Sequence, residues 1–161
     1  MKLDEIDLKI LVALQEDGRI TKTKLAESVH LSVSPCHERV KRLEQAGYIN
    51  GYRTEINIDR IVRNSLVFVQ VHLKQHRAED FIKFDEAIRQ TPEVIECHAL
   101  GGGIDYFLKM IVNDIQHYQQ KIEFLLSSDL NIERYFTHIV TKKIKQSVFP
   151  IEELLKTAAE T

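Results

Sequence analysis

The residues best suited to chemistry lie in one run, Leu31–Glu44. Within this run, Cys36, Val40 and Leu43 recur at the i, i+4 and i+7 spacing of one helix face. The opposite face carries side chains that donate and accept hydrogen bonds or bear charge: His37, Glu38, Lys41 and Arg42. A short helix with one apolar and one basic, polar face has the shape and chemistry that the major groove of duplex DNA accepts.

The start of this helix is marked by two kinds of residue. Serine accepts hydrogen bonds from the free N–H groups of a first turn, and proline tolerates that turn because it needs no donor there. Ser34 followed by Pro35 therefore predicts the helix start, with Ser32 as the alternative cap.

Two roles are expected on the polar face. Side chains near the helix N-terminus are expected to meet base edges, and Arg39, Lys41 and Arg42 are expected to clamp phosphates. The alternatives are a solvated face and a pair between Glu38 and Lys41 or Arg42 on the same helix. The candidate DNA-contacting residues are Lys22, Ser32, Ser34, Pro35, His37, Glu38, Arg39, Lys41 and Arg42.

Charge is distributed unevenly along the chain. The 161 residues carry a net charge of −2, and 43% of them are hydrophobic, as expected for a globular protein with a buried core. Arg19–Arg53 holds seven basic and three acidic residues, a local charge of +4. A basic region on a near-neutral chain is suited to a nucleic-acid partner.

The elements around this helix predict a winged helix-turn-helix at residues 1–57. Asp4 and Thr21 are suited to cap two earlier helices, and Gly18 and Gly47 to end the first and third. The Asn-Gly pair in Tyr48–Ile56 predicts a β-hairpin, the wing. A polar linker, residues 58–64, is expected to follow.

Residues 65–150 follow a different pattern. Strand-like and helix-like segments alternate as βαββαβ, which predicts a ferredoxin-like sandwich with two helices on one face of an antiparallel sheet. Residues 151–161 form a C-terminal tail too short to cover the other face, so a second subunit is the expected partner. The fold class is therefore α+β. The expected strands and helices are Leu66–Leu73, Ala78–Arg89, Val94–Leu100, Tyr106–Val112, Ile115–Leu126 and Ile132–Ile144.

The loop between the two middle strands, Gly101–Asp105, is the second candidate site. Glycines leave backbone N–H groups open to a carboxylate, and Asp105 has the charge to face an ammonium group. The simpler interpretation is a hairpin turn in which glycine supplies a positive φ, and from the residues alone this turn is favoured. The candidate effector-binding residues are Gly101, Gly102, Gly103, Ile104 and Asp105.

Taken in order, these segments resemble the Lrp/AsnC (feast/famine) family of transcriptional regulators. The similar segments are Leu3–Leu11, Leu31–Glu44, Gly47–Ile49 and the G-x-x-D-Y sequence Gly102–Tyr106. The resemblance implies double-stranded DNA as a partner, a C-terminal RAM-type domain that senses a small effector, an amino acid by class, and a dimer or an octamer of four dimers. Gly101 departs from the family pattern, where many members carry a serine or threonine hydroxyl.

Other functions are expected to be absent. No GxxxxGK[ST], HExxH or GxSxG pattern occurs, so neither a catalytic site nor a cofactor is expected. Cys36 fits the apolar stripe as a core residue better than it fits a redox switch. Cys97 and His98 are neighbours on a strand and point to opposite faces, so no metal site is expected. With no signal segment or membrane-length apolar run, a cytoplasmic location is the default.

Two alternatives in other functional classes remain. Sirohaem decarboxylases resemble this family in both halves but hold a tetrapyrrole, and the seven histidines are compatible with such a group. The basic Arg39–Arg42 run favours DNA binding over this enzyme. A small-molecule sensor without DNA binding is the third possibility.

Overall fold

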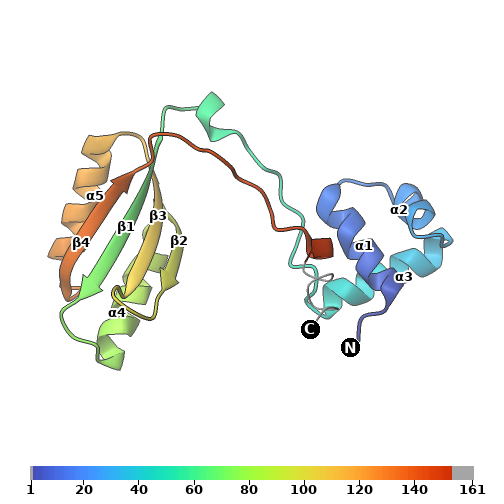
Figure 1. The fold of residues 1–161 in the computed structure, drawn as a ribbon, viewed down its shortest axis with the longest axis horizontal. Coiled ribbons are helices and arrows are strands. Elements are labelled where there is room, and N and C mark those ends of the chain that lie inside the picture. The colour runs from blue at the N-terminus through green and yellow to red at the C-terminus, as the bar shows by residue number, and fades with distance from the viewer. Residues whose placement is uncertain (1, 154–161) are drawn as a thin grey trace. The chain divides into compact units, whose positions relative to one another are not determined.

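The chain divides into two units by its internal contacts. The computed structural model describes residues 2–153 (Figure 1). One unit contains residues 1–55 together with the segment that begins at Lys145, and the other contains Ile56–Ile144. The expected division at residues 57 and 150 stays a prediction. By internal contacts, the segment after Ile144 groups with the N-terminal unit.

Three helices build the N-terminal unit: α1 (Glu5–Glu16), α2 (Lys22–Ser28) and α3 (Val33–Gln45). The predicted caps are confirmed at Asp4, whose side chain accepts from the Asp7 N–H, and at Thr21, which accepts from the Lys24 N–H. Apolar side chains from all three helices form one core. Its buried members are Ile10, Leu11, Leu25, Ala26, Val29, Cys36, Val40 and Leu43.

The end of α3 follows the prediction at Gly47. This residue has φ +76°, and its N–H donates to the Glu44 carbonyl while the Tyr48 N–H donates to the Leu43 carbonyl, both at 3.0 Å. The pair of bonds is a Schellman motif, which needs the left-handed conformation that glycine adopts without strain. Ser32, rather than Ser34, is the N-cap of α3.

The predicted wing hairpin is wrong in this structure, because residues 48–57 contain no strand. A type I′ turn needs positive φ at both central residues. Gly51 has φ +145°, but Asn50 is not among the residues with positive φ. Tyr52 instead turns back to α3, where its hydroxyl donates to Glu44 at 3.0 Å.

The second unit is the predicted βαββαβ fold. Its elements are a short 3₁₀ turn, η1 (Ile58–Arg60), followed by β1 (Ser65–Leu73), α4 (Ala78–Arg89), β2 (Val94–Ala99), β3 (Tyr106–Val112), α5 (Ile115–Ser127) and β4 (Ile132–Ile139). The four strands form an antiparallel sheet in the order β2-β3-β1-β4. The last strand ends at Ile139, earlier than the predicted Ile144.

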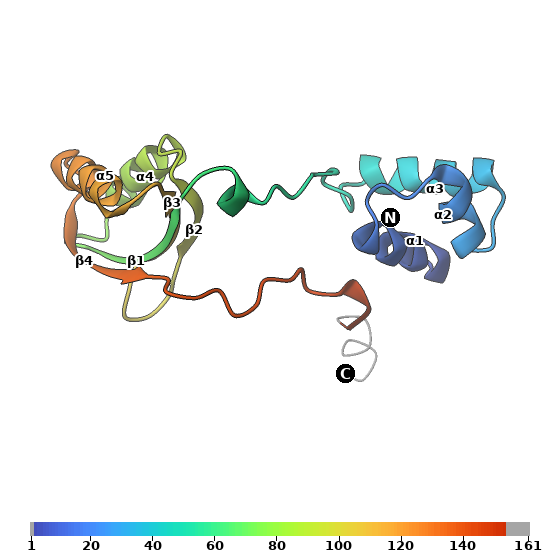
Figure 2. The ribbon, with the colours of Figure 1, turned by 90° about the horizontal axis from the view of Figure 1, so that it is seen from above.

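Both helices of this unit cover the same face of the sheet (Figure 2). Alternation places Val67, Val69 and Val71 of β1 under the helices, and each is at most 2% exposed. The register pairs them with Met110, Leu108 and Tyr106 of β3, so one apolar layer runs across the two central strands.

Candidate functional site: the exposed face of α3 and the β2–β3 loop

Helix α3 buries one stripe and exposes another. Cys36, Val40 and Leu43 are buried in the core, as predicted. The exposed stripe consists of residues at i, i+4, i+7 and i+11. Its members are Ser34, Glu38, Lys41 and Gln45. A shallow hollow of about 300 Å³ along this side is lined by residues 38, 39, 41, 42 and 45.

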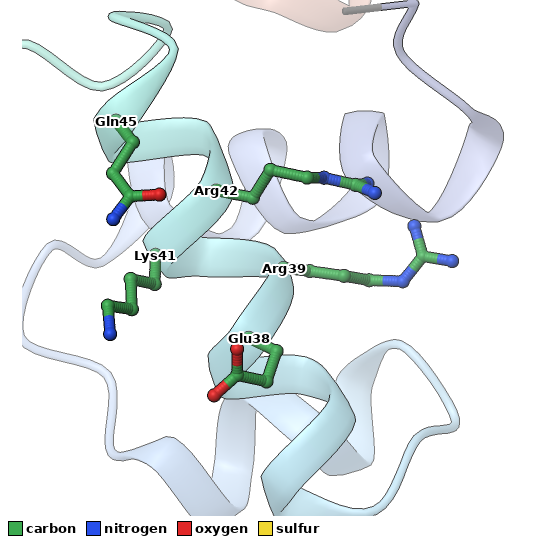
Figure 3. Close-up of a pocket in the computed structure, with 5 residues that line it drawn as sticks. All are labelled: Glu38, Arg39, Lys41, Arg42 and Gln45. Atoms are coloured by element: carbon green, nitrogen blue, oxygen red, sulfur yellow. The ribbon is translucent and has the colours of Figure 1, made fainter.

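The two arginines of α3 turn away from the exposed stripe, toward the start of α1 (Figure 3). Arg39 Nη1 lies 2.6 Å from Asp4 Oδ2 and 2.8 Å from Asp7 Oδ1. Arg42 Nη2 lies 3.0 Å from Asp7 Oδ1 and 2.9 Å from Oδ2, so it donates to both oxygens. The Asp7 side chain is fully buried. We call these four residues the α1–α3 clamp.

The clamp changes the role expected for two basic residues. Arg39 and Arg42 were expected to hold phosphates, but their guanidinium groups are occupied by carboxylates within the protein. A hydrogen bond from the Asp7 N–H and one from Arg39 lower the pKa of Asp4, so its carboxylate stays charged at neutral pH. Lys41 is exposed and points to the other side of the helix.

Two further candidates meet at the N-terminal end of α3. Lys22 Nζ lies 3.4 Å from His37 Nε2, so the start of α2 and the second turn of α3 present their polar side chains together. His30, with φ +55°, makes the turn between these helices. The other candidates at this end of α3 are all exposed: Ser32, Ser34, Pro35 and Glu38.

The alternatives for two α3 residues are resolved by their contacts. Among residues 2–153, no ion pair joins Glu38 to Lys41 or Arg42, and Arg42 is instead bound to Asp7. Cys36 is 2% exposed, and burial raises the pKa of its thiol. Cys36 is therefore a core residue with little thiolate at neutral pH.

Sequence reasoning missed Asp7 and Gln45. Gln45 continues the exposed spacing that begins at Ser34, and counting one turn further would have included it. Asp7 stands three residues after the cap Asp4, the spacing of a capping box, which the helix has. Its partners on α3 are Arg39, which lies 32 positions further along the chain, and Arg42, which lies 35 positions further. Local spacing does not reveal contacts over such separations.

The β2–β3 loop is open, as a ligand site requires. A Cβ built on any of its three glycines meets nothing within 4 Å in this chain, and only Gly102, with φ +124°, needs glycine for its backbone. Ile104 is half-buried beside them.

Asp105 is bound within the protein. Its Oδ2 accepts from the Leu73 N–H at 2.8 Å, and its Oδ1 lies 2.9 Å from His76 Nε2. The Asp105 backbone N–H also donates to Val71. The carboxylate expected to face an ammonium group therefore joins the end of β1 to the loop, which supports the turn interpretation for this residue.

These contacts predict acid sensitivity. Burial opposes the shift, but the Leu73 N–H and His76 lower the pKa of Asp105 below its ordinary value of 3.8. Because the folded pKa is the lower one, the stabilisation is present above about pH 4–5 and is lost as pH falls through the folded pKa. Urea unfolding between pH 3 and 7 should therefore show a weaker pH dependence in Asp105→Asn than in the natural chain. Equal slopes would contradict this role for Asp105.

The face of the sheet opposite the helices has no cover within the unit. Phe68 and Phe107 stack there with ring centres 5.3 Å apart. Phe136 is 48% exposed and meets His72 edge-on at 5.9 Å. We call this surface, with Leu66 and Ile111 on the same alternation, the open sheet face.

Metal-ligand clusters and membrane-length helices are both absent from the described residues. No group of three or more His, Cys, Asp or Glu side chains within residues 2–153 is arranged to hold a metal ion. The register places Cys97 opposite Leu108 and His98 opposite Phe107, on opposite faces as predicted. Within the same range, every helix is too short or too polar to cross a bilayer.

Comparison with known proteins gives one family match to each half of the chain. Residues 3–50 match the winged helix-turn-helix DNA-binding family, and residues 66–148 match the Lrp/AsnC ligand binding domain. The chain belongs to the Lrp/AsnC family. As in that family, a DNA-binding helix-turn-helix is joined to a ligand-binding domain, which makes the chain a DNA-binding transcriptional regulator.

Individual relatives cover nearly all of this Lrp/AsnC chain. The transcriptional regulatory protein DoeX of Halomonas elongata is 56% identical over 91% of this chain and 92% of the relative. The leucine-responsive regulatory protein of Escherichia coli is 38% identical over 90% of this chain and 88% of its own. A Neisseria meningitidis transcriptional regulator solved with L-Met superposes with a TM-score of 0.86 at 32% identity, covering 95% of this chain and 99% of its own.

Proposed function

We propose that the regulator contacts duplex DNA through the exposed stripe of α3, with Lys41 on a phosphate and the stripe's N-terminal residues toward base edges. The observation that carries this assignment is the α1–α3 clamp. It holds Arg39 and Arg42 against α1, so the side left for DNA is the one with Ser34, Glu38 and Lys41. Lys22 and His37 extend this surface near the N-terminal end of α3.

Lys41→Ala tests the assignment. The test duplex is selected from a randomised pool with the full chain. Loss of one phosphate contact should weaken binding to all sequences and reduce the slope of log affinity against log salt by about one. Lys24→Ala, at an exposed position of α2, is the matched control. An unchanged affinity and salt slope in Lys41→Ala would contradict the assignment.

We also propose that the second unit senses a small zwitterion, an amino acid by class. The three glycine N–H groups of the β2–β3 loop suit a carboxylate, because open space lies where side chains would stand. Two relatives support this class: one is named leucine-responsive and another was solved with L-Met. Asp105 would shape the loop through Leu73 and His76.

The glycines themselves provide the test of the sensor. Gly101→Ala and Gly103→Ala add one methyl group without backbone strain, because neither residue has a positive φ and nothing lies within 4 Å. A thermal-shift screen of the twenty amino acids should identify one that raises the melting temperature, and both variants should lose that shift while folding normally. If no amino acid stabilises the natural chain, or both variants keep the shift, the proposed site is wrong.

Assembly is the third part of the proposed function. We propose that two copies pair through the open sheet face, which would bury Phe68, Phe107 and Phe136 and present two DNA-binding units. The family resemblance adds octamers of four such dimers. As a DNA-bound regulator, the protein would act in the cytoplasm.

The tetrapyrrole enzyme remains the second candidate, although the relatives compared are named regulators. Purified protein is expected to show no Soret band of its own, and an added tetrapyrrole is expected not to bind to it. A bound, absorbing complex would favour the enzyme, and failure to bind any selected duplex would favour a sensor without DNA.

A further inference from the structure

The C-terminal segment makes specific contacts with the DNA-binding unit. The side-chain amide of Gln15, near the end of α1, donates to the Phe149 carbonyl at 3.0 Å and accepts from the Ile151 N–H at 2.9 Å. It thus binds the backbone as a neighbouring strand would. Ile151 packs against the core formed by α1, α2 and α3. Figure 1 shows the C-terminal end of the described chain beside α1.

These contacts change how the two units are connected. The chain leaves the DNA-binding unit after Glu55, forms the whole second unit, and returns at Lys145. Two chain segments therefore run between the units, one through η1 and one after β4, and the second is held to the DNA-binding unit by noncovalent contacts. A single flexible connection lets a unit sample many orientations, whereas a second one removes much of that freedom.

We propose that the segment from Lys145 to Ile151 is a strap that fixes the orientation of the DNA-binding unit. In the dimer of the proposed function, on which this inference rests, the strap would set the spacing between the two recognition helices. Two bound units gain affinity over one only when their spacing matches the two half-sites. The strap would thereby determine which spacing of half-sites the regulator accepts.

The test measures spacing discrimination. A half-site selected with the full chain is placed twice on one duplex, and the centre-to-centre distance is varied one base pair at a time. The natural chain should favour one spacing by about thirtyfold or more, as expected for bivalent binding. Gln15→Ala and Ile151→Asp should reduce that preference to about threefold while affinity for a single half-site stays unchanged.

Glu16→Ala, exposed and next in α1, is the matched control and should keep the full preference. Unchanged affinity for a single half-site shows that a variant is folded. If Ile151→Asp does not fold, the comparison relies on Gln15→Ala alone. Full spacing preference in both strap variants would overturn the strap. A natural chain that binds all spacings equally would also overturn it, and light scattering on that sample would show whether the proposed dimer fails too.

Discussion

Asp7→Ala is expected to destabilise the DNA-binding unit by about 2–4 kcal/mol. Removing one member of a buried ion pair typically costs about 3–5 kcal/mol. Here Asp7 is fully buried, but Arg39 and Arg42 keep 25% and 50% of their side-chain surface exposed and would regain water. The loss should therefore fall around or below the lower end of that range. For a unit of this size it corresponds to about 8–32 °C in melting temperature.

Hydrogen exchange measures this loss separately from the second unit, because peptides from α1–α3 and from the sheet are distinguished by mass. Exchange should accelerate in residues 5–45 and remain unchanged in residues 65–139. Glu27→Ala, an exposed acid on α2, is the control and should change neither region. Natural-like protection of α3 in Asp7→Ala would show that the clamp does not hold this helix in place.

Phe136→Asp should convert the proposed dimer into a monomer. In one chain Phe136 is about half exposed, so a charge there should disturb the fold little. In a paired sheet the carboxylate would be buried without a partner, at a cost of several kcal/mol. Affinity for a duplex with two half-sites should fall by about 10²–10⁴, and affinity for one half-site should not change.

Ile82→Asp is the matched control for this variant. Ile82 is 58% exposed on α4, which lies on the covered side of the sheet, so the dimer should persist. Light scattering at micromolar concentration distinguishes the two variants. If Phe136→Asp remains a dimer, the open sheet face is not the interface, and another surface must join the copies.

The fold could be predicted wherever local pattern and long-range packing agree. The alternation of apolar residues in β1 identifies a strand with one buried face. The i, i+4 spacing in α4 and α5 likewise identifies helices with one buried face, and these assignments give the βαββαβ order. The helix caps depend on residues three positions apart and were likewise predictable. The wing was not, because Asn-Gly favours a turn but Tyr52 finds a partner on α3.

The candidate DNA surface was only partly predictable. Charge and periodicity place Lys41 and Arg42 on the same solvent-exposed face of α3. The long side chain of an arginine, however, can carry its guanidinium group to a neighbouring helix. The partner that redirects Arg39 and Arg42 is Asp7, more than thirty residues earlier in the chain. The strap was missed for the same reason, because Gln15 and Ile151 lie near opposite ends of the sequence.

The most direct test of the account is DNA affinity of a variant in which Ser34, Glu38, Lys41 and Gln45 are all alanine, measured by fluorescence anisotropy from 50 to 200 mM salt. The clamp is untouched in this variant, so its helical circular dichroism and melting temperature should match those of the natural chain. Affinity for the selected duplex should fall by about a hundredfold or more, since lost base contacts cost about 1–3 kcal/mol each. A folded variant that binds with natural affinity and salt dependence would contradict the assignment of α3 as the helix that reads DNA.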